Sequence, residues 1–231
     1  MNKDEINTYL KRSLKNGSQF DQYIDRPANT NRQLDKGDTY FTAKMMKIWA
    51  ENHFKQVTRL AQVLKKSSLQ DTCSNIHSFL YNYIQYEIDG LLQQLRSPAN
   101  SWYTARETGI DCKSYSIFAS TILLNLGIKH YLRQIKQPLF NPSQFTHIYV
   151  IVPIDQVTGS LSGGYYTIDG TLKNNKEPRF TAAKDVYMKD LPHIGLNAPA
   201  KRKIAKKKPV KRSVKRTTTK KTISGGIKIF R

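Results

Sequence analysis

Cysteine is scarce in this sequence. Only two of its 231 residues are cysteines, Cys73 and Cys112, and two thiols are too few for a disulfide framework. Disulfides rarely persist in reducing compartments, and a chain with so few cysteines is typical of a protein made there. We therefore expect both cysteines to be free thiols when the chain is synthesised.

Long apolar runs are also missing. No segment approaches the roughly 18 apolar residues of a membrane-spanning helix. The first residues, MNKDEIN, carry charges where a secretory signal has its apolar stretch. A membrane is therefore not an expected partner, and neither is secretion by a signal peptide. We expect a cytoplasmic protein, or one that is packaged from the cytoplasm.

Acidic residues are absent from the C-terminal end. The chain has 38 Lys and Arg residues against 17 Asp and Glu residues, which gives a formal net charge of +21. Fourteen of the basic residues follow residue 190, whereas the first 190 residues hold 24 basic and all 17 acidic ones, net +7. An excess of positive charge favours nucleic acid or another anionic surface as partner.

Composition divides the chain into three parts. Residues 1–42 form a polar arm, in which a short helix is expected near 6–14, and residues 43–196 have the composition of one folded domain. Residues 197–231 form a tail rich in Lys and Arg. The tail cannot bury enough apolar surface to offset its ordering entropy, so the sequence predicts that it is disordered when alone.

The tail has the residues needed for contacts with phosphate groups. Because it has no aromatic residue before Phe230, we expect it to neutralise phosphates without reading bases or stacking on them. Three alternatives stay open: a solubilising extension, a lysine-rich acyl acceptor, and an address signal. The expected nucleic-acid contacts are Lys201, Arg202, Lys203, Lys206, Lys207, Lys208, Lys211, Arg212, Lys215 and Arg216.

Helical periodicity marks three segments of the middle part. Apolar residues recur at helical spacing over 43–64, over 72–86 and from Cys112 to about residue 126. Gly127 then occupies the position of a C-cap glycine. Residues 96–109, between the second and third helices, are expected to form a loop.

Three strand-like segments follow the third helix. They cover 130–135, 145–152 and 165–169, and apolar and polar side chains alternate most clearly in the second. Helices followed by consecutive strands predict an α+β fold, in which a helical layer packs on a mainly antiparallel sheet.

Cys112 stands where chemistry favours a thiolate, at the start of a helix just after a glycine-containing turn. The helix dipole and the free N–H groups stabilise an anion there. A nucleophile also needs a base and an orienting acid. His147 is a candidate base and Asp169 a candidate orienting acid, and each stands at an end of a predicted strand. Other readings stay open: a packed thiol, a structural strand histidine and an Asp–Gly turn.

The remaining cysteine and histidines are interpreted as structural. We expect Cys73 to pack in its helix, His53 to be a satisfied boundary residue, and His130 and His193 to be surface residues. No cluster has metal-ligand spacing and no phosphate-binding glycine loop is present, so neither a metal nor a cofactor is expected. Spacing does not select an oxyanion donor among three upstream side chains: Trp102, Gln93 and Gln94.

Five short motifs together resemble the transglutaminase-like superfamily of papain-related cysteine hydrolases. They are NYIQYE with RSP (82–87 and 96–98), GIDCKSYS (109–116), LLNLGI (123–128), THIYV (146–150) and YYTIDGT (165–171). The resemblance covers about residues 70–175. It departs from the family at Ile110, since the family often has glycine directly before Asp-Cys.

The resemblance implies that Cys112, His147 and Asp169 are the nucleophile, the base and the orienting acid. The expected function is thiol-dependent acyl transfer on peptide or carboxamide bonds, either as a cysteine protease or amidase or as a transglutaminase, with a protein or peptide substrate. The alternative is a non-catalytic structural or packaging protein. The small size, polar arm and basic tail are more loosely similar to auxiliary virion proteins of tailed bacteriophages.

Overall fold

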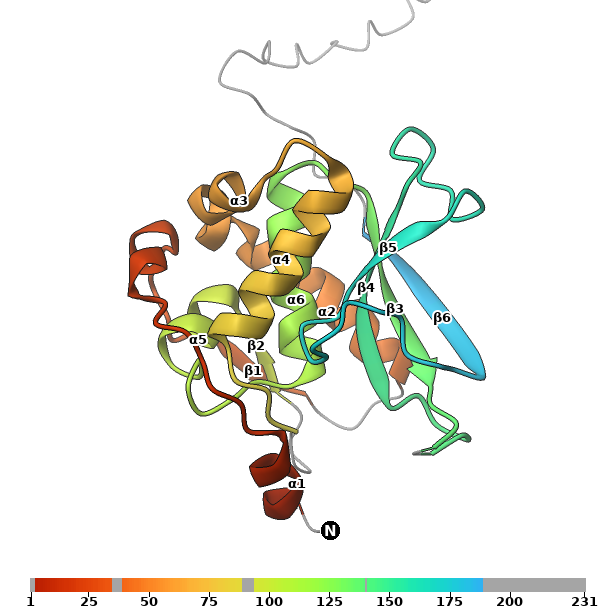
Figure 1. The fold of residues 1–231 in the computed structure, drawn as a ribbon, viewed down its shortest axis with the longest axis horizontal. Helices are drawn as coiled ribbons and strands as arrows, with labels where there is room; N and C mark the ends of the chain where they lie inside the picture. Colours follow the sequence, from red (N-terminus) through yellow and green to blue (C-terminus); the bar gives the residue numbers. More distant parts are fainter. Residues whose placement is uncertain (1–2, 35–38, 89–93, 140, 189–231) are drawn as a thin grey trace, which may run out of the picture. The chain divides into compact units, whose positions relative to one another are not determined.

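A computed structural model describes residues 3–34, 39–88, 94–139 and 141–188. Within these residues a layer of helices packs on one face of a four-stranded antiparallel sheet (Figure 1). This arrangement confirms the predicted α+β class. The basic tail, 197–231, lies outside the described residues, as do His193 and Gln93.

The helices occupy most of the N-terminal two thirds of the described chain. Their bounds are α1 (Lys3–Leu10), η1 (Ser18–Tyr23), α2 (Thr39–His53), η2 (Phe54–Val57), α3 (Thr58–Leu64), α4 (Leu69–Tyr83), α5 (Pro98–Tyr103) and α6 (Cys112–Asn125), where η marks a 3-10 helix. The helices α1, α4 and α6 correspond to the helices predicted near 6–14, 72–86 and 112–126.

The prediction of one continuous helix over 43–64 was wrong. The 3-10 turn η2 separates α2 from α3, and the side chain of Asn125 holds this turn. Its amide donates to the Phe54 carbonyl at 2.6 Å, and its oxygen accepts from the Thr58 hydroxyl at 2.8 Å. A contact with a distant segment therefore interrupts the helix, although the helical spacing of apolar residues continues through the break.

The prediction of a loop over 96–109 was also incomplete, because helix α5 lies within it. Ser97 caps this helix by accepting from the Asn100 N–H at 3.2 Å, and Pro98 occupies its first turn. Ser followed by Pro is a known helix-start signal. The segment was assigned to a loop because its apolar pattern is too short to show a period.

The described part of the arm packs against the domain. The ring of Phe20 meets the rings of Phe79 and Trp102 edge-on, with centroids 5.0 and 6.2 Å apart. The Trp102 indole N–H donates to Asp21 at 2.7 Å. All described residues accordingly fall in one compact unit.

The main sheet has the order β5-β4-β3-β6, and all neighbours are antiparallel. Its strands are β3 (His130–Lys136), β4 (His147–Pro153), β5 (Tyr165–Ile168) and β6 (Ala182–Met188). The first three match the predicted segments, whereas β6 was missed because polar side chains interrupt its apolar pattern. Two short strands, β1 (Asn31–Gln33) and β2 (Gln94–Arg96), form a separate antiparallel pair.

The alternation predicted for β4 places its side chains on two faces. Ile148, Val150 and Val152 join the main core under the helices. Tyr149 and Ile151 belong to a smaller cluster. A strand buried on both sides has little freedom to slip, because a shift by one residue would exchange the two faces.

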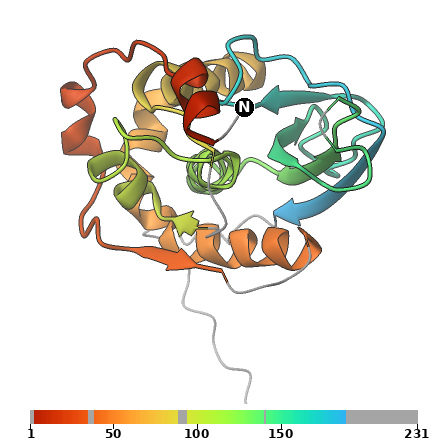
Figure 2. The same cartoon turned by 90° about the horizontal axis from the view of Figure 1, so that it is seen from below.

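Helix α6 lies in the middle of the domain, where Figure 2 shows it end-on. It contacts α2, α3, α4, α5 and β4, and twelve of its fourteen residues are buried. Gly127, with φ of 66°, follows as the predicted C-cap glycine. The start of α6, with Cys112, is thereby held rigidly beside β4.

Candidate functional site

Cys112 is the first residue of α6, and Asp111 caps the helix. The Asp111 carboxylate accepts from the Ser114 N–H at 3.0 Å and also pairs with Lys113, and both of these charged side chains are buried. The first N–H groups of a helix have no acceptor within it. The Asp111 cap therefore satisfies the Ser114 N–H and fixes the first turn of the helix that begins with Cys112.

The hydroxyl of Ser116 ties the start of α6 to the sheet. Its oxygen lies 2.8 Å from the Cys112 carbonyl and 3.1 Å from the Ile148 carbonyl, so the hydroxyl can donate to either. Ile148 is the neighbour of His147 in β4. This one side chain therefore connects the backbone of the cysteine to the backbone next to the histidine.

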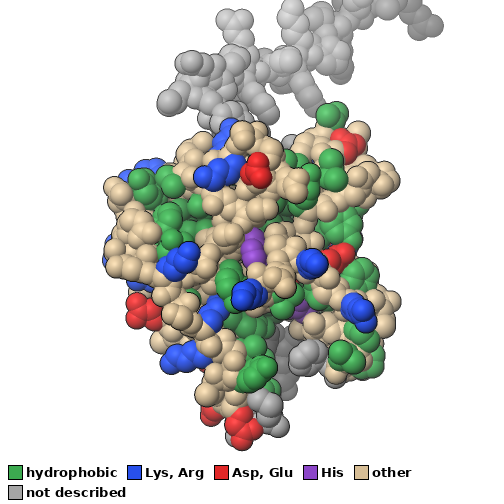
Figure 3. All heavy atoms as spheres, in the orientation of Figure 1, with side chains coloured by type: hydrophobic (Ala, Val, Ile, Leu, Met, Phe, Trp, Pro, Cys, Tyr) green, Lys and Arg blue, Asp and Glu red, His purple; other side chains and the backbone are tan. Residues whose placement is uncertain are grey.

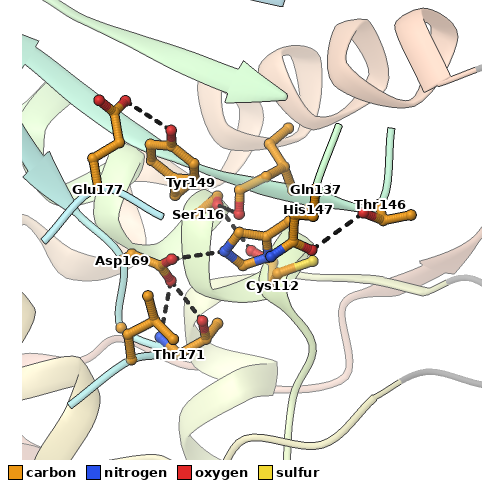
Figure 4. A network of polar contacts seen from close by, with 12 residues as sticks. Cys112, Ser116, Gln137, Thr146, His147, Tyr149, Asp169, Thr171 and Glu177 are labelled. Carbon is orange, nitrogen blue, oxygen red and sulfur yellow. Dashed lines mark hydrogen bonds and ion pairs between the residues drawn. The ribbon is translucent and has the colours of Figure 1, made fainter. Parts of the chain in front are cut away.

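His147 opens β4, where it is the register partner of Ile135. Its Nε2 lies 2.6 Å from Oδ2 of Asp169. In Figure 4 the imidazole stands between Asp169 and Cys112, with one ring nitrogen toward each. The structure thus brings together all three residues that the sequence predicted for the site.

Asp169 directly follows β5 and is almost fully buried. While Oδ2 faces His147, Oδ1 accepts from the Thr171 N–H at 3.1 Å and from its hydroxyl at 2.7 Å. Each carboxylate oxygen is therefore engaged, and the acid has a single orientation. Sequence reasoning missed Thr171, although an Asp that bonds the backbone two residues on is a standard feature of Asp-Gly turns.

The charges of the acid and the base stabilise each other. Burial by itself would lower the pKa of His147, but the Asp169 charge, the hydrogen bond to Asp169 and the nearby Cys112 side chain raise it to about 10. Burial by itself would raise the pKa of Asp169, but the His147 charge and the Thr171 bonds lower it. Each of the two groups therefore favours the charged form of the other.

Tyr149 supports the imidazole from the same strand. Its ring centroid lies 5.7 Å from that of His147, and its hydroxyl donates to Glu177 at 2.7 Å. Glu177 also accepts from Tyr165 at 2.6 Å and from Arg133 at 2.9 Å. The tyrosine next to the histidine is therefore fixed at its far end as well as by the sheet.

The second cysteine lies in a different environment. Cys73 is fully buried in α4, and this burial raises its pKa to about 12. Cys112, by contrast, is partly exposed. The interpretation of Cys73 as a packed side chain agrees with this burial.

Two of the other predictions can also be compared with the structure. His53 is partly buried and its Nδ1 lies 2.8 Å from the Trp49 carbonyl, as expected for a satisfied boundary residue. The prediction that His130 lies at the surface was wrong. It is fully buried, with its nitrogens bonded to Ser120 and to the Ile128 carbonyl at 2.7 and 2.8 Å. The two hydrogen bonds satisfy both ring nitrogens, so the polar ring can be buried. Nothing in the sequence indicates these partners.

One of the three upstream candidates for an oxyanion donor is engaged elsewhere. The indole N–H of Trp102 donates to Asp21, which removes Trp102 from the candidates Trp102, Gln93 and Gln94.

In the described part of the chain, no helix is both long and apolar enough to cross a bilayer.

Comparison with known proteins identifies the family of the domain. The family model for the transglutaminase-like domain matches residues 55–176, more than half of the chain, and Cys112, His147 and Asp169 all lie within the match. No curated protein and no solved structure matches the chain significantly. With this match, and with a cysteine-bearing helix packed on the strands that carry the histidine and the acid, the chain belongs to the transglutaminase-like domain family.

Proposed function

We propose that this protein catalyses thiol-dependent acyl transfer on peptide or carboxamide bonds. Cys112 is the nucleophile, His147 transfers protons and Asp169 orients the imidazole. The observation that carries the proposal is the placement of the His147 imidazole between the Cys112 side chain and a buried carboxylate, to which it is bonded (Figure 4). Such a linear set of nucleophile, base and acid is the usual arrangement for acyl transfer.

The charged His147–Asp169 pair favours a resting thiolate–imidazolium pair. The Cys112 thiolate attacks the carbonyl carbon, a C–S bond forms, and the carbonyl electrons move to oxygen. N–H groups at the start of α6 stabilise this oxyanion. When the oxyanion collapses, the C–N bond breaks, the imidazolium proton passes to the leaving amine, and a thioester with a neutral His147 remains.

The thioester is then transferred to an acceptor. Neutral His147 takes a proton from water as the water oxygen attacks, which releases the acid and regenerates the thiolate and the imidazolium. We favour water, and hence a protease or amidase, because water needs no second binding site. A lysine amine in its place would make the enzyme a transglutaminase, and the sequence and fold are compatible with both.

The experiment is turnover of peptide and glutamine-donor libraries by the full chain, with and without an added amine. Cys112→Ala is expected to abolish turnover, and His147→Ala to reduce it nearly as much, because the two residues act as a unit. Asp169→Asn keeps the shape but disturbs the imidazole orientation, and in a serine protease the corresponding change costs about 10⁴ in kcat. Cys73→Ala is the matched control and is expected to retain turnover.

Thermal melts must accompany these assays, because an unfolded variant reports nothing about roles. Turnover that survives His147→Ala in a folded protein would remove histidine from the mechanism. An unreactive Cys112 and no turnover in the wild-type chain would favour the alternative, in which the domain is a scaffold for a packaging protein such as a virion component.

We further propose that the tail tethers the protein to nucleic acid through the ten basic residues named above. The support is its charge, +14 after residue 190 against +7 for the preceding 190 residues. On the face drawn in Figure 3, Lys and Arg side chains of the domain are dispersed among uncharged ones. Phosphate contacts without base contacts give affinity without sequence preference.

A further inference from the structure

Arg12, in the N-terminal arm, reaches the backbone next to the candidate acid. Its Nη2 lies within hydrogen-bond distance of three oxygens: the Ile84 carbonyl at 2.9 Å, the Tyr115 hydroxyl at 2.5 Å and the Gly170 carbonyl at 3.1 Å. Gly170 directly follows Asp169, and Tyr115 lies one helical turn after Cys112. One guanidinium thus joins the acid-bearing turn to the cysteine-bearing helix.

The surrounding packing allows little movement of this turn. The Tyr115 ring lies so close to Gly170 that a Cβ there would be 2.7 Å from its Cδ1. The Tyr115 hydroxyl also donates to the Ile84 carbonyl at 2.5 Å. The Arg12 guanidinium carbon lies 4.0 Å from the centroid of the Tyr81 ring, a cation–π contact. The guanidinium is therefore held by a ring as well as by its acceptors.

The arm itself is anchored where Arg12 enters. The Arg12 N–H donates to the Gln85 side chain at 3.2 Å, and the Gln85 amide returns a bond to the Leu10 carbonyl at 3.4 Å. Closer to the N-terminus, the Asn7 side chain accepts from the Ile88 N–H at 2.9 Å. These contacts attach the arm to the segment after α4, so the backbone that leads to Arg12 is held in place.

From these contacts we infer that Arg12 is a positioning residue for the proposed acyl-transfer site: it holds the Asp169-Gly170 turn so that the carboxylate faces His147. The inference rests on the proposed function. Arg12 lies outside the residues that match the family, 55–176. In this inference, the arm supplies a residue that fixes the geometry of the acyl-transfer site although the arm lies outside the family match.

The chemistry of arginine suits this task. A planar guanidinium presents several fixed donors, whereas a lysine ammonium is a compact point charge on a flexible stem. Lysine at this position would keep the charge, but its flexible ammonium lacks the planar group that lies over the Tyr81 ring. The charged or titratable groups around Asp169 include His147, His77, Tyr115 and, one residue away, Arg12. His77 is neutral at neutral pH, because burial lowers its pKa.

The test uses alkylation of Cys112, which needs no substrate. Its rate with iodoacetamide is measured in the full chain from about pH 5 to pH 9, a range in which a thiolate–imidazolium pair keeps a cysteine reactive below the usual thiol range. The variants are Arg12→Met, which keeps the aliphatic stem, Arg12→Lys, which keeps the charge, and Lys11→Met. The last is the matched control, since it removes the neighbouring exposed charge.

Arg12→Met is expected to lower the rate near pH 5.5 by roughly 10- to 100-fold, because the loss of hydrogen bonds made by a charged group has effects of about this size. Arg12→Lys should lie between Arg12→Met and wild type, and Lys11→Met should match wild type. In the Asp169→Asn background, Arg12→Met should have no further effect, because its influence passes through Asp169. A purely structural role would instead give the same additional loss in both backgrounds.

Two results would overturn the inference: a wild-type pH profile in Arg12→Met, or an equal drop in the Asp169→Asn background. If Arg12→Met does not fold, Arg12→Lys carries the same comparison, since it retains the buried charge. Failure of the proposed function has a different signature. In that case wild-type Cys112 itself reacts no faster below neutral pH than an ordinary thiol, whatever occupies position 12.

Discussion

Brief treatment of the native chain with iodoacetamide near pH 7 is expected to label Cys112 and leave Cys73 unmodified. The thiolate is the reactive form of cysteine, so selectivity follows from the thiolate population and from access. The two sites differ in both respects. Cys73 is fully buried in α4, while Cys112 is partly exposed at the start of α6 beside His147, whose pKa is raised by the Asp169 carboxylate.

The magnitude follows from the environment of Cys73. Burial raises its pKa from 9.0 to about 12, so its thiolate population near neutral pH is about 10³-fold lower than that of an ordinary thiol. Access adds to this factor, because the reagent reaches a fully buried sulfur only when α4 opens locally. We therefore expect Cys112 to react at least about 10³-fold faster than Cys73.

The assay is peptide mapping by mass spectrometry after short exposures and a thiol quench. Labelling in strong denaturant is the control, because both cysteines should react at similar rates once burial and the imidazolium are lost. His147→Ala should slow the labelling of Cys112 most strongly below neutral pH. Equal labelling of both thiols in the native protein, or preferential labelling of Cys73, would refute the reasoning.

Three other predictions concern the packing, the charged pair and the tail. Gly170→Ala should destabilise the fold by about 1–3 kcal/mol, because its Cβ would be only 2.7 Å from a buried ring, whereas Gly163→Ala, with open space around it, should be nearly neutral in the same denaturant titration. Equal effects would contradict this packing argument. The His147–Asp169 pair should contribute on the order of a few kcal/mol. This contribution is complete between about pH 4 and about pH 6.5, the unfolded values of aspartate and histidine. It is lost in acid as Asp169 is protonated, because the folded pKa of Asp169 is lowered, and it is lost as pH rises toward about 10, because the folded pKa of His147 is raised. Unfolding of wild type and Asp169→Asn at several pH values measures the difference, and a gap that widens with pH in that range would argue against the pair. Removing the tail should abolish sequence-independent duplex binding and spare Cys112 reactivity. For the full chain, affinity should fall by roughly 10³–10⁵ between about 50 and 200 mM salt if about 6–10 phosphates are contacted. Undiminished binding by the truncated chain would assign it to the folded domain.

Local signals in the sequence predicted much of the framework of the site. An Asp at the cap position before Cys112, Gly127 at the other end of the same helix, and the alternation beginning at His147 are patterns that short-range physics produces. They placed the cysteine at a helix start and the histidine at the start of a strand. The structure agrees at both positions.

Contacts between distant segments decided the remaining features. Residues 43–64 show one helical period, but Asn125 holds the turn that divides them. His130 carries no sequence mark of its two buried partners. In each case the stabilising hydrogen bonds involve a partner outside the local sequence pattern. A pattern that spans only a few turns therefore cannot predict them.

What the sequence alone determined is therefore which residue types stand at which element ends, Cys112, His147 and Asp169 among them. What only the tertiary structure decided is that these ends meet. The β4–β5 register and the Thr171 bonds aim the carboxylate of Asp169 at the imidazole. The Arg12 guanidinium reaches the same turn from the arm. The physical reason is that capping and periodicity depend on neighbours within a few residues, whereas register, burial and long-range hydrogen bonds form only when the whole core closes.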